Sequence, residues 1–147
     1  MSTHKNSNNA LMKKRLKIYF QGYLSKRSWG RHNESGIKKL FNFLASWERR
    51  YFTITREGVY FTDGSSSPDI LDNLIFSSTF SFCCGASTGY QYGVLINSSH
   101  RTLQIDAEDV FTFAYFVHFL SKAILENKNI QQNRFISFAR VRGGCQS

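Results

Sequence analysis

Two predicted strands each place a cation at the end of an otherwise apolar face, and phosphate is the anion that such a pair can hold. The strands are expected over 18–27 and 47–56, where side chains alternate between two faces. On the first strand, Lys26 shares a face with Phe20, Gly22 and Leu24. On the second, Arg50 shares a face with Phe52 and Ile54. If the apolar members face a core, Lys26 and Arg50 point into the mouth of whatever the strands enclose.

The stretch that follows Lys26 and leads to the second strand adds further positive charge. Its basic residues are Arg27, Arg31, Lys38 and Lys39, and its acid is Glu34. Cations in a loop can reach the same phosphates as cations on the strands, so these four are secondary candidates for an anion site. The alternative interpretation is that they are ordinary solvated charges, because exposed Lys and Arg are common.

The charge of the whole chain is divided unevenly. Its 147 residues carry 19 Lys and Arg against 10 Asp and Glu, a net charge of +9. The basic excess belongs to residues 1–56, whereas the remainder is slightly acidic. One surface is therefore expected to meet an anion, either a membrane headgroup or a nucleic acid. Nucleic acid is the weaker alternative, because the aromatic residues follow core spacings rather than forming a stacking platform.

Several other classes of protein are disfavoured. The sequence has no apolar run long enough to span a bilayer and no apolar segment of a secretion signal near its start. The three cysteines, Cys83, Cys84 and Cys145, make a poor disulfide framework and lack the spacing of a zinc site. The four histidines are scattered. We expect an intracellular protein without a metal or cofactor.

Short strands dominate the rest of the pattern. Beyond the first two, they are expected at 59–62, 70–76, 79–84, 92–96 and 101–105. A helix follows, with Asp106 and Asp109 resembling a capping box at its start. Its expected core-facing stripe is Val110, Phe113, Val117, Leu120 and Ile124, broadened by Phe111, Tyr115, Phe116 and Phe119. The fold class is thus mainly β with one C-terminal helix, in the form of a seven-stranded barrel or sandwich.

Two motifs in this frame resemble the pleckstrin homology (PH) domain. They are GYLSKR at 22–27 and WERRYF at 47–52, and the resemblance covers about residues 16–127. It implies a seven-stranded barrel capped by a helix and a phosphoinositide site. Carried onto this chain, the site consists of Lys26 and Arg50 first, then Arg27, Lys39, Lys38 and Arg31. Residues 1–15 are expected to be a flexible basic lead.

Glu48 departs from that family's pattern. Phosphoinositide-binding PH domains usually have Lys or Arg two positions before the arginine of the second strand. An acid beside the headgroup would lower affinity unless it turned away or paired with Arg49. Many members also have a tryptophan in the final helix, where this chain has Tyr115 and Phe116.

A narrower resemblance points to the PH domain of eukaryotic phospholipase D of the type with PX and PH modules. It rests on QYGVLIN at 91–97, HRTL at 100–103 and NRFISFARVR at 133–142. In that family a similar segment leads toward the catalytic region, so residues 128–147 are expected to be a linker-like tail. The two His-x-Lys-x-x-x-x-Asp motifs of that chemistry are absent from the sequence. This chain is therefore not expected to hydrolyse phosphatidylcholine by itself, whether or not it is a fragment of such an enzyme.

The expected function is recruitment of a phospholipase D-type protein to phosphoinositides on the cytosolic face of a membrane. The chain would be cytoplasmic and peripherally bound. One alternative is that it belongs to a phospholipase D acting in lipid catabolism or signalling. Another is a PH module that binds a protein partner without lipid specificity, since one fold supports many functions.

Overall fold

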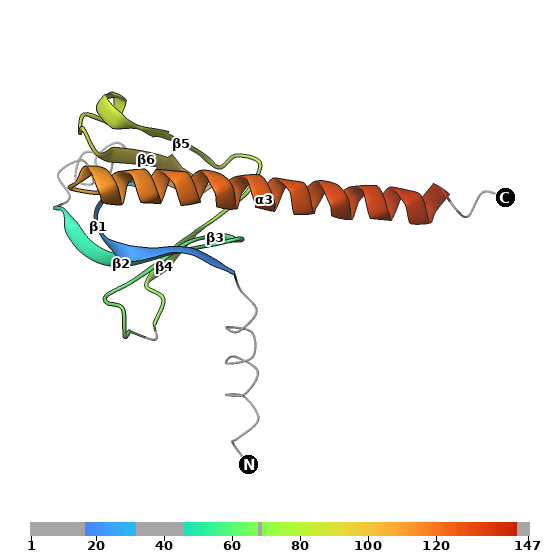
Figure 1. Cartoon of the computed structure of the whole chain (residues 1–147), viewed down its shortest axis with the longest axis horizontal. Coiled ribbons are helices and arrows are strands. Elements are labelled where there is room, and N and C mark those ends of the chain that lie inside the picture. The colour runs from blue at the N-terminus through green and yellow to red at the C-terminus, as the bar shows by residue number, and fades with distance from the viewer. Residues whose placement is uncertain (1–16, 32–45, 68, 144–147) are drawn as a thin grey trace, which may run out of the picture.

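The computed structural model describes residues 17–31, 46–67 and 69–143. Within these ranges, strands precede one long α-helix (Figure 1). The strands are β1 (Ile18–Arg31), β2 (Glu48–Thr55), β3 (Gly58–Thr62), β4 (Asp72–Ile75), β5 (Ser81–Cys84), β6 (Gly93–Asn97) and β7 (Arg101–Asp106). A short 3-10 turn, η1 (Gly85–Thr88), separates β5 from β6, and the helix is α3 (Val110–Gly143).

The seven described strands form one antiparallel sheet in the order β4-β3-β2-β1-β7-β6-β5. Strand β1 is central and pairs with β2 on one side and β7 on the other. Leu24 lies opposite Arg50 on β2, whereas Lys26 lies opposite Ile105 on β7. The predicted combination of seven strands and a C-terminal helix is confirmed.

Strand β1 is longer than the sequence predicts. Its end was expected at Arg27, but it continues to Arg31. The reason is pairing with β7, which places Ser28 opposite Leu103 and Arg31 opposite Arg101. Ser28 and Arg31 are thus paired with a strand that is distant in sequence, which local turn signals cannot indicate.

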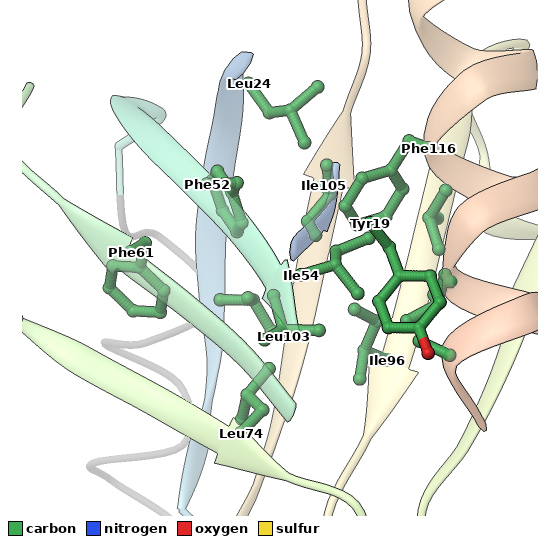
Figure 2. Close-up of a cluster of buried hydrophobic side chains, with 14 of the residues drawn as sticks. Tyr19, Leu24, Phe52, Ile54, Phe61, Leu74, Ile96, Leu103, Ile105 and Phe116 are labelled. Carbon is green, nitrogen blue, oxygen red and sulfur yellow. The ribbon is translucent and has the colours of Figure 1, made fainter. Parts of the chain in front are cut away.

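The core lies on the face of the sheet that α3 covers. Its fully buried large side chains include Leu120 and seven that Figure 2 labels: Leu24, Phe52, Ile54, Ile96, Leu103, Ile105 and Phe116. The ring of Phe116 meets Phe20 edge-on at 5.3 Å between centroids and Phe52 at 6.3 Å. The alternation predicted for β1 and β2 is therefore confirmed.

The apolar stripe of α3 agrees with the expected one except near its start, since Phe113, Val117, Phe119 and Ile124 pack against the core. Phe116, Leu120 and Ala123 are its buried members. Val110, expected to begin the stripe, has half of its surface exposed, and Phe111 is more exposed still. The helix begins before it reaches the core, so its first turn lies outside the packed layer.

Asp109, rather than Asp106, caps the helix. Its carboxylate accepts a hydrogen bond from the backbone N–H of Thr112 at 2.8 Å and one from the Thr112 hydroxyl at 2.8 Å. These bonds hold the pKa of Asp109 below its usual value. Asp106 instead accepts from the N–H of Glu108, which has a positive φ of 69° and forms the bend before the helix.

The helix also runs well past its expected end. The tail predicted from residue 128 is helical as far as Gly143 (Figure 1). No glycine or proline occurs between Val110 and Arg142, so nothing in the backbone stops the helix. Loss of the apolar periodicity after Ile124 marks the point where the helix leaves the core. A domain boundary at residue 127 stays a prediction.

Polar contacts fasten α3 to the sheet just before it leaves. The hydroxyl of Tyr19 donates a hydrogen bond to Glu126, and Lys17 Nζ lies 3.3 Å from the same carboxylate. Asn127 Nδ2 donates to the carbonyl oxygen of Arg56 at 2.9 Å. Burial, followed by the bond to Glu126, raises the pKa of Tyr19 to about 12.

Replacing Tyr19 with phenylalanine should lower the free energy of unfolding near neutral pH by about 1 kcal/mol, the usual net value of one such hydrogen bond. The folded-state pKa exceeds the unfolded value of 10.0, so the stabilisation is complete below that pH and is lost as pH rises through about 12. Urea unfolding at about pH 8 and pH 11 checks both statements. The Tyr19→Phe variant should lose less stability than the parent between these pH values, and an equal loss would contradict the assignment.

Candidate anion-binding site

Lys26 points into the fold, as its parity predicts. The residue is 7% exposed, next to the core residue Leu24 of the same strand. Its Nζ lies 3.0 Å from Glu48 Oε2 and 5.0 Å from the ring centroid of Phe61. A buried ammonium is costly without a partner, so the carboxylate and the aromatic face together explain how this lysine is accommodated.

Arg50 reaches the same place from β2. Its Nη2 lies 3.2 Å from Glu48 Oε2, and its Nη1 lies 3.4 Å from Asp63 Oδ1. The side chain is 26% exposed, and its buried Nε has no hydrogen-bond partner within the described residues. Lys26 and Arg50 therefore converge on one carboxylate oxygen while Arg50 retains an unused donor.

Glu48 is the centre of this arrangement. The hydrogen bond from Lys26 is the largest cause that holds the pKa of Glu48 below its usual value, and Arg50 acts in the same direction. The carboxylate neither turns away nor pairs with Arg49, the two possibilities that the sequence suggested. Arg49 Nη1 instead lies 3.1 Å from Glu108 Oε2. The carboxylate of Glu48 is thus the anion that pairs with both Lys26 and Arg50.

Arg101 is a further inward cation that the sequence analysis missed. Its guanidinium lies 5.5 Å from the ring centroid of Phe61, the same ring that Lys26 contacts. Its Nη1 lies 2.6 Å from Asp72 Oδ2. The signal was present, because Arg101 alternates in phase with the buried Leu103 and Ile105 on β7. We call Lys26, Arg50, Arg101, Glu48, Asp63 and Asp72 the mouth cluster.

The structure does not bring Arg27 to the mouth cluster. Its Nη2 donates to Gln104 Oε1 at 2.8 Å, and its guanidinium lies 5.1 Å from the Trp47 ring. Adjacent residues on a strand face opposite ways, so Arg27 belongs to the other face from Lys26. Arg31 ends β1 opposite Arg101. Lys38 and Lys39 lie outside the described residues.

Two open grooves lie elsewhere on the described surface. One, of about 520 Å³, is lined by residues 19–23 of β1, Arg49 of β2 and the first turns of α3. The other, of about 690 Å³, lies between the β4–β5 connection and the later turns of α3. Neither includes a member of the mouth cluster.

The His, Cys, Asp and Glu side chains of the described ranges are not arranged as a metal site. Groups of three His, Cys, Asp or Glu that could hold a metal ion are not found there, and Cys83 and Cys84 are exposed free thiols. No helix in the described part of the chain has the length and apolar character needed to cross a membrane.

Comparison with known proteins finds matches among solved structures. The chain matches no protein-family model and no curated protein. Among solved structures, it resembles the PH domain of human pleckstrin homology domain-containing family A member 5, with a TM-score of 0.55 and 15% identity, covering 76% of this chain and 80% of that one.

Two further solved structures give the same result. The PH domain of human TBC1 domain family member 2 has a TM-score of 0.52 and 19% identity, with coverage of 78% of this chain and 84% of that one. The Slm1 PH domain in complex with inositol-4-phosphate has a TM-score of 0.52 and 10% identity, with coverage of 75% and 96%. At these identities the likeness shows the fold: the chain has the pleckstrin homology fold.

Proposed function

We propose that this PH-fold chain binds a phosphorylated inositol headgroup through the mouth cluster and thereby attaches peripherally to the cytosolic face of a membrane. The observation that carries the proposal is the convergence of Lys26 and Arg50 on a single oxygen, Glu48 Oε2, at 3.0 and 3.2 Å. Two cations held at that spacing are equally suited to one phosphate oxygen. Lys26 and Arg50 are the principal ligands, and Arg101 is a neighbouring one.

Two other observations support this function. The Slm1 PH domain, which has the same fold, was solved in complex with inositol-4-phosphate. The first 56 residues hold the basic excess of the chain, and Arg31, Lys38 and Lys39 follow Lys26 within it. Such charges attract anionic lipids by about 1 kcal/mol each near the surface. They would increase the concentration of the protein at a membrane that displays the headgroup.

The parent protein that we propose is a phospholipase D-type enzyme, on the resemblance of residues 91–97, 100–103 and 133–142. This chain would supply recruitment and not hydrolysis, because it carries no His-x-Lys motif. A nucleophile and a phosphate clamp are both needed for that reaction. A protein partner in place of the lipid is the alternative that the following experiment separates.

Liposome binding at fixed total charge tests the lipid proposal. Phosphoinositide is exchanged for an equal charge of phosphatidylserine, and binding is measured by co-sedimentation at two salt concentrations. We expect binding to rise with phosphoinositide content at both salts, because headgroup recognition in the mouth is screened less than surface attraction. Binding that depends on total charge alone would contradict the proposal.

A further inference from the structure

The second half of α3 forms a groove that the mouth cluster does not use. Its walls are the β4–β5 connection and the helix from Ile124 to Ile136. Phe76, Phe80 and Ile124 supply apolar surface at the inner part, while Phe135 and Ile136 continue that surface along the helix. Phe135 is 74% exposed and Ile136 50% exposed. The volume of the groove is about 690 Å³.

The described helix α3 continues past the strands of the sheet (Figure 1). Among the described residues, the last polar contacts that join α3 to the rest of the fold are those of Glu126 and Asn127. The sixteen residues from 128 to 143 extend about 24 Å at 1.5 Å per residue. Most helical stability in proteins comes from packing an apolar face. A projecting helix with an uncovered phenylalanine and isoleucine is therefore suited to packing against another element.

The charge of the projecting helix indicates the chemical character of the element that would pack against it. The sequence from Asn127 to Gly143 contains Lys128, Arg134, Arg140 and Arg142 and no acid. A second copy of this helix would bring like charges together, and so would the first sixteen residues, which are also basic and without an acid. An acidic partner is complementary. The groove is concave, which suits the cylinder of an amphipathic helix.

The position of the groove also argues against a bilayer as the occupant. Ser25 and Arg49, which adjoin the mouth cluster, both contact Glu108 just before α3 begins. The opposite end of β1, at Lys17 and Tyr19, contacts Glu126. The groove and the mouth cluster therefore lie toward opposite ends of β1. A membrane bound at the mouth would leave the groove facing solvent.

We propose that this groove binds an acidic amphipathic helix of a protein partner, with Phe135 and Ile136 as apolar anchors and Lys128 as the charged contact. The partner's apolar residues at positions i, i+3, i+4 and i+7 would lie along the groove. This inference does not depend on the proposed lipid function, because the two surfaces share no residue.

A pair of designed peptides tests the proposal. Both are about eighteen residues long with leucine at the helical spacing above; one carries glutamate at the remaining positions and the other lysine. Binding of the labelled peptides to the full chain is followed by fluorescence anisotropy. We expect the acidic peptide to bind at least about tenfold more tightly than the basic one, and Phe135→Ala or Lys128→Glu to weaken it about tenfold.

Two matched variants serve as controls. Phe111 is 76% exposed on the same helix but far from the groove, so Phe111→Ala should leave peptide binding unchanged. Lys122→Glu changes an exposed charge outside the groove lining. Equal affinity for the two peptides, or equal effects of Phe111→Ala and Phe135→Ala, would overturn the proposal. Dimerisation or liposome binding that Phe135→Ala abolishes would assign the surface to a second copy or to a membrane instead.

Discussion

Replacing Lys26 with methionine should reduce binding to phosphoinositide liposomes by about tenfold or more while the protein remains folded. A hydrogen bond to a charged group contributes about 1.5–3 kcal/mol, and about 1.4 kcal/mol corresponds to a tenfold change in affinity. Methionine is about as long as the lysine stem and can pack against Phe61, so the space beside that ring stays filled. Reversal to glutamate would instead bury an acid beside Glu48 and is the poorer test.

Removing the acidic partner of the same ion pair should instead strengthen binding to the headgroup. Glu48→Gln removes the anion that occupies Lys26 and Arg50, so we expect affinity for the headgroup to increase by roughly fivefold, or about 1 kcal/mol. Lys122→Met removes one exposed positive charge away from the mouth and serves as the control for general attraction. Binding that falls equally in Lys26→Met and Lys122→Met would contradict the site, as would weaker binding by Glu48→Gln.

Truncation of Phe116 to alanine should have the largest effect on stability. The ring is fully buried between the sheet and α3 and contacts Phe20 and Phe52 edge-on. Its removal should lower the free energy of unfolding by about 3–5 kcal/mol, because it leaves a cavity that the rigid sheet cannot close. Urea denaturation followed by circular dichroism measures the change.

Phe111→Ala is the matched control for that experiment, since Phe111 lies on the same helix and is mostly exposed. Its effect should stay within about 0.5 kcal/mol. A similar loss for the two variants would mean that α3 does not pack on the sheet through the Phe116 face. The sequence alone placed both residues in one broad apolar stripe.

Alternation within single strands was the most informative part of the sequence. It correctly directed Lys26 and Arg50 toward the core side, because the parity of a strand is a local property. The same rule places Arg27 on the opposite face, but Arg27 was counted with the loop cations because a loop was expected from residue 28. That interpretation failed since the extension of β1 to Arg31 depends on pairing with β7.

The ionic partners could not be derived in the same way. Glu48 lies opposite Lys26 because of the register between β1 and β2, and Arg101 meets the Phe61 ring although β1 and β2 separate β7 from β3 in the sheet. These relationships join residues far apart in the chain. The end of the helix was mispredicted for a different reason. No glycine or proline occurs between Val110 and Gly143, so only the loss of apolar periodicity suggested an end. That loss marks where the helix leaves the core and not where the helix stops.

The pairing of Glu48 with Lys26 and Arg50 also links the binding of phosphate to the binding of a proton by that carboxylate. The neighbouring lysine depresses the pKa of Glu48 in the unliganded protein. A phosphate that takes over Lys26 and Arg50 would return that carboxyl toward its ordinary pKa, so the liganded state would bind protons more readily than the free state. By thermodynamic reciprocity, a pH low enough to protonate a carboxyl of ordinary pKa, near 4.5, should then favour the lipid-bound form. Attachment to a membrane would in this way be coupled to the acidity of the surface on which it occurs.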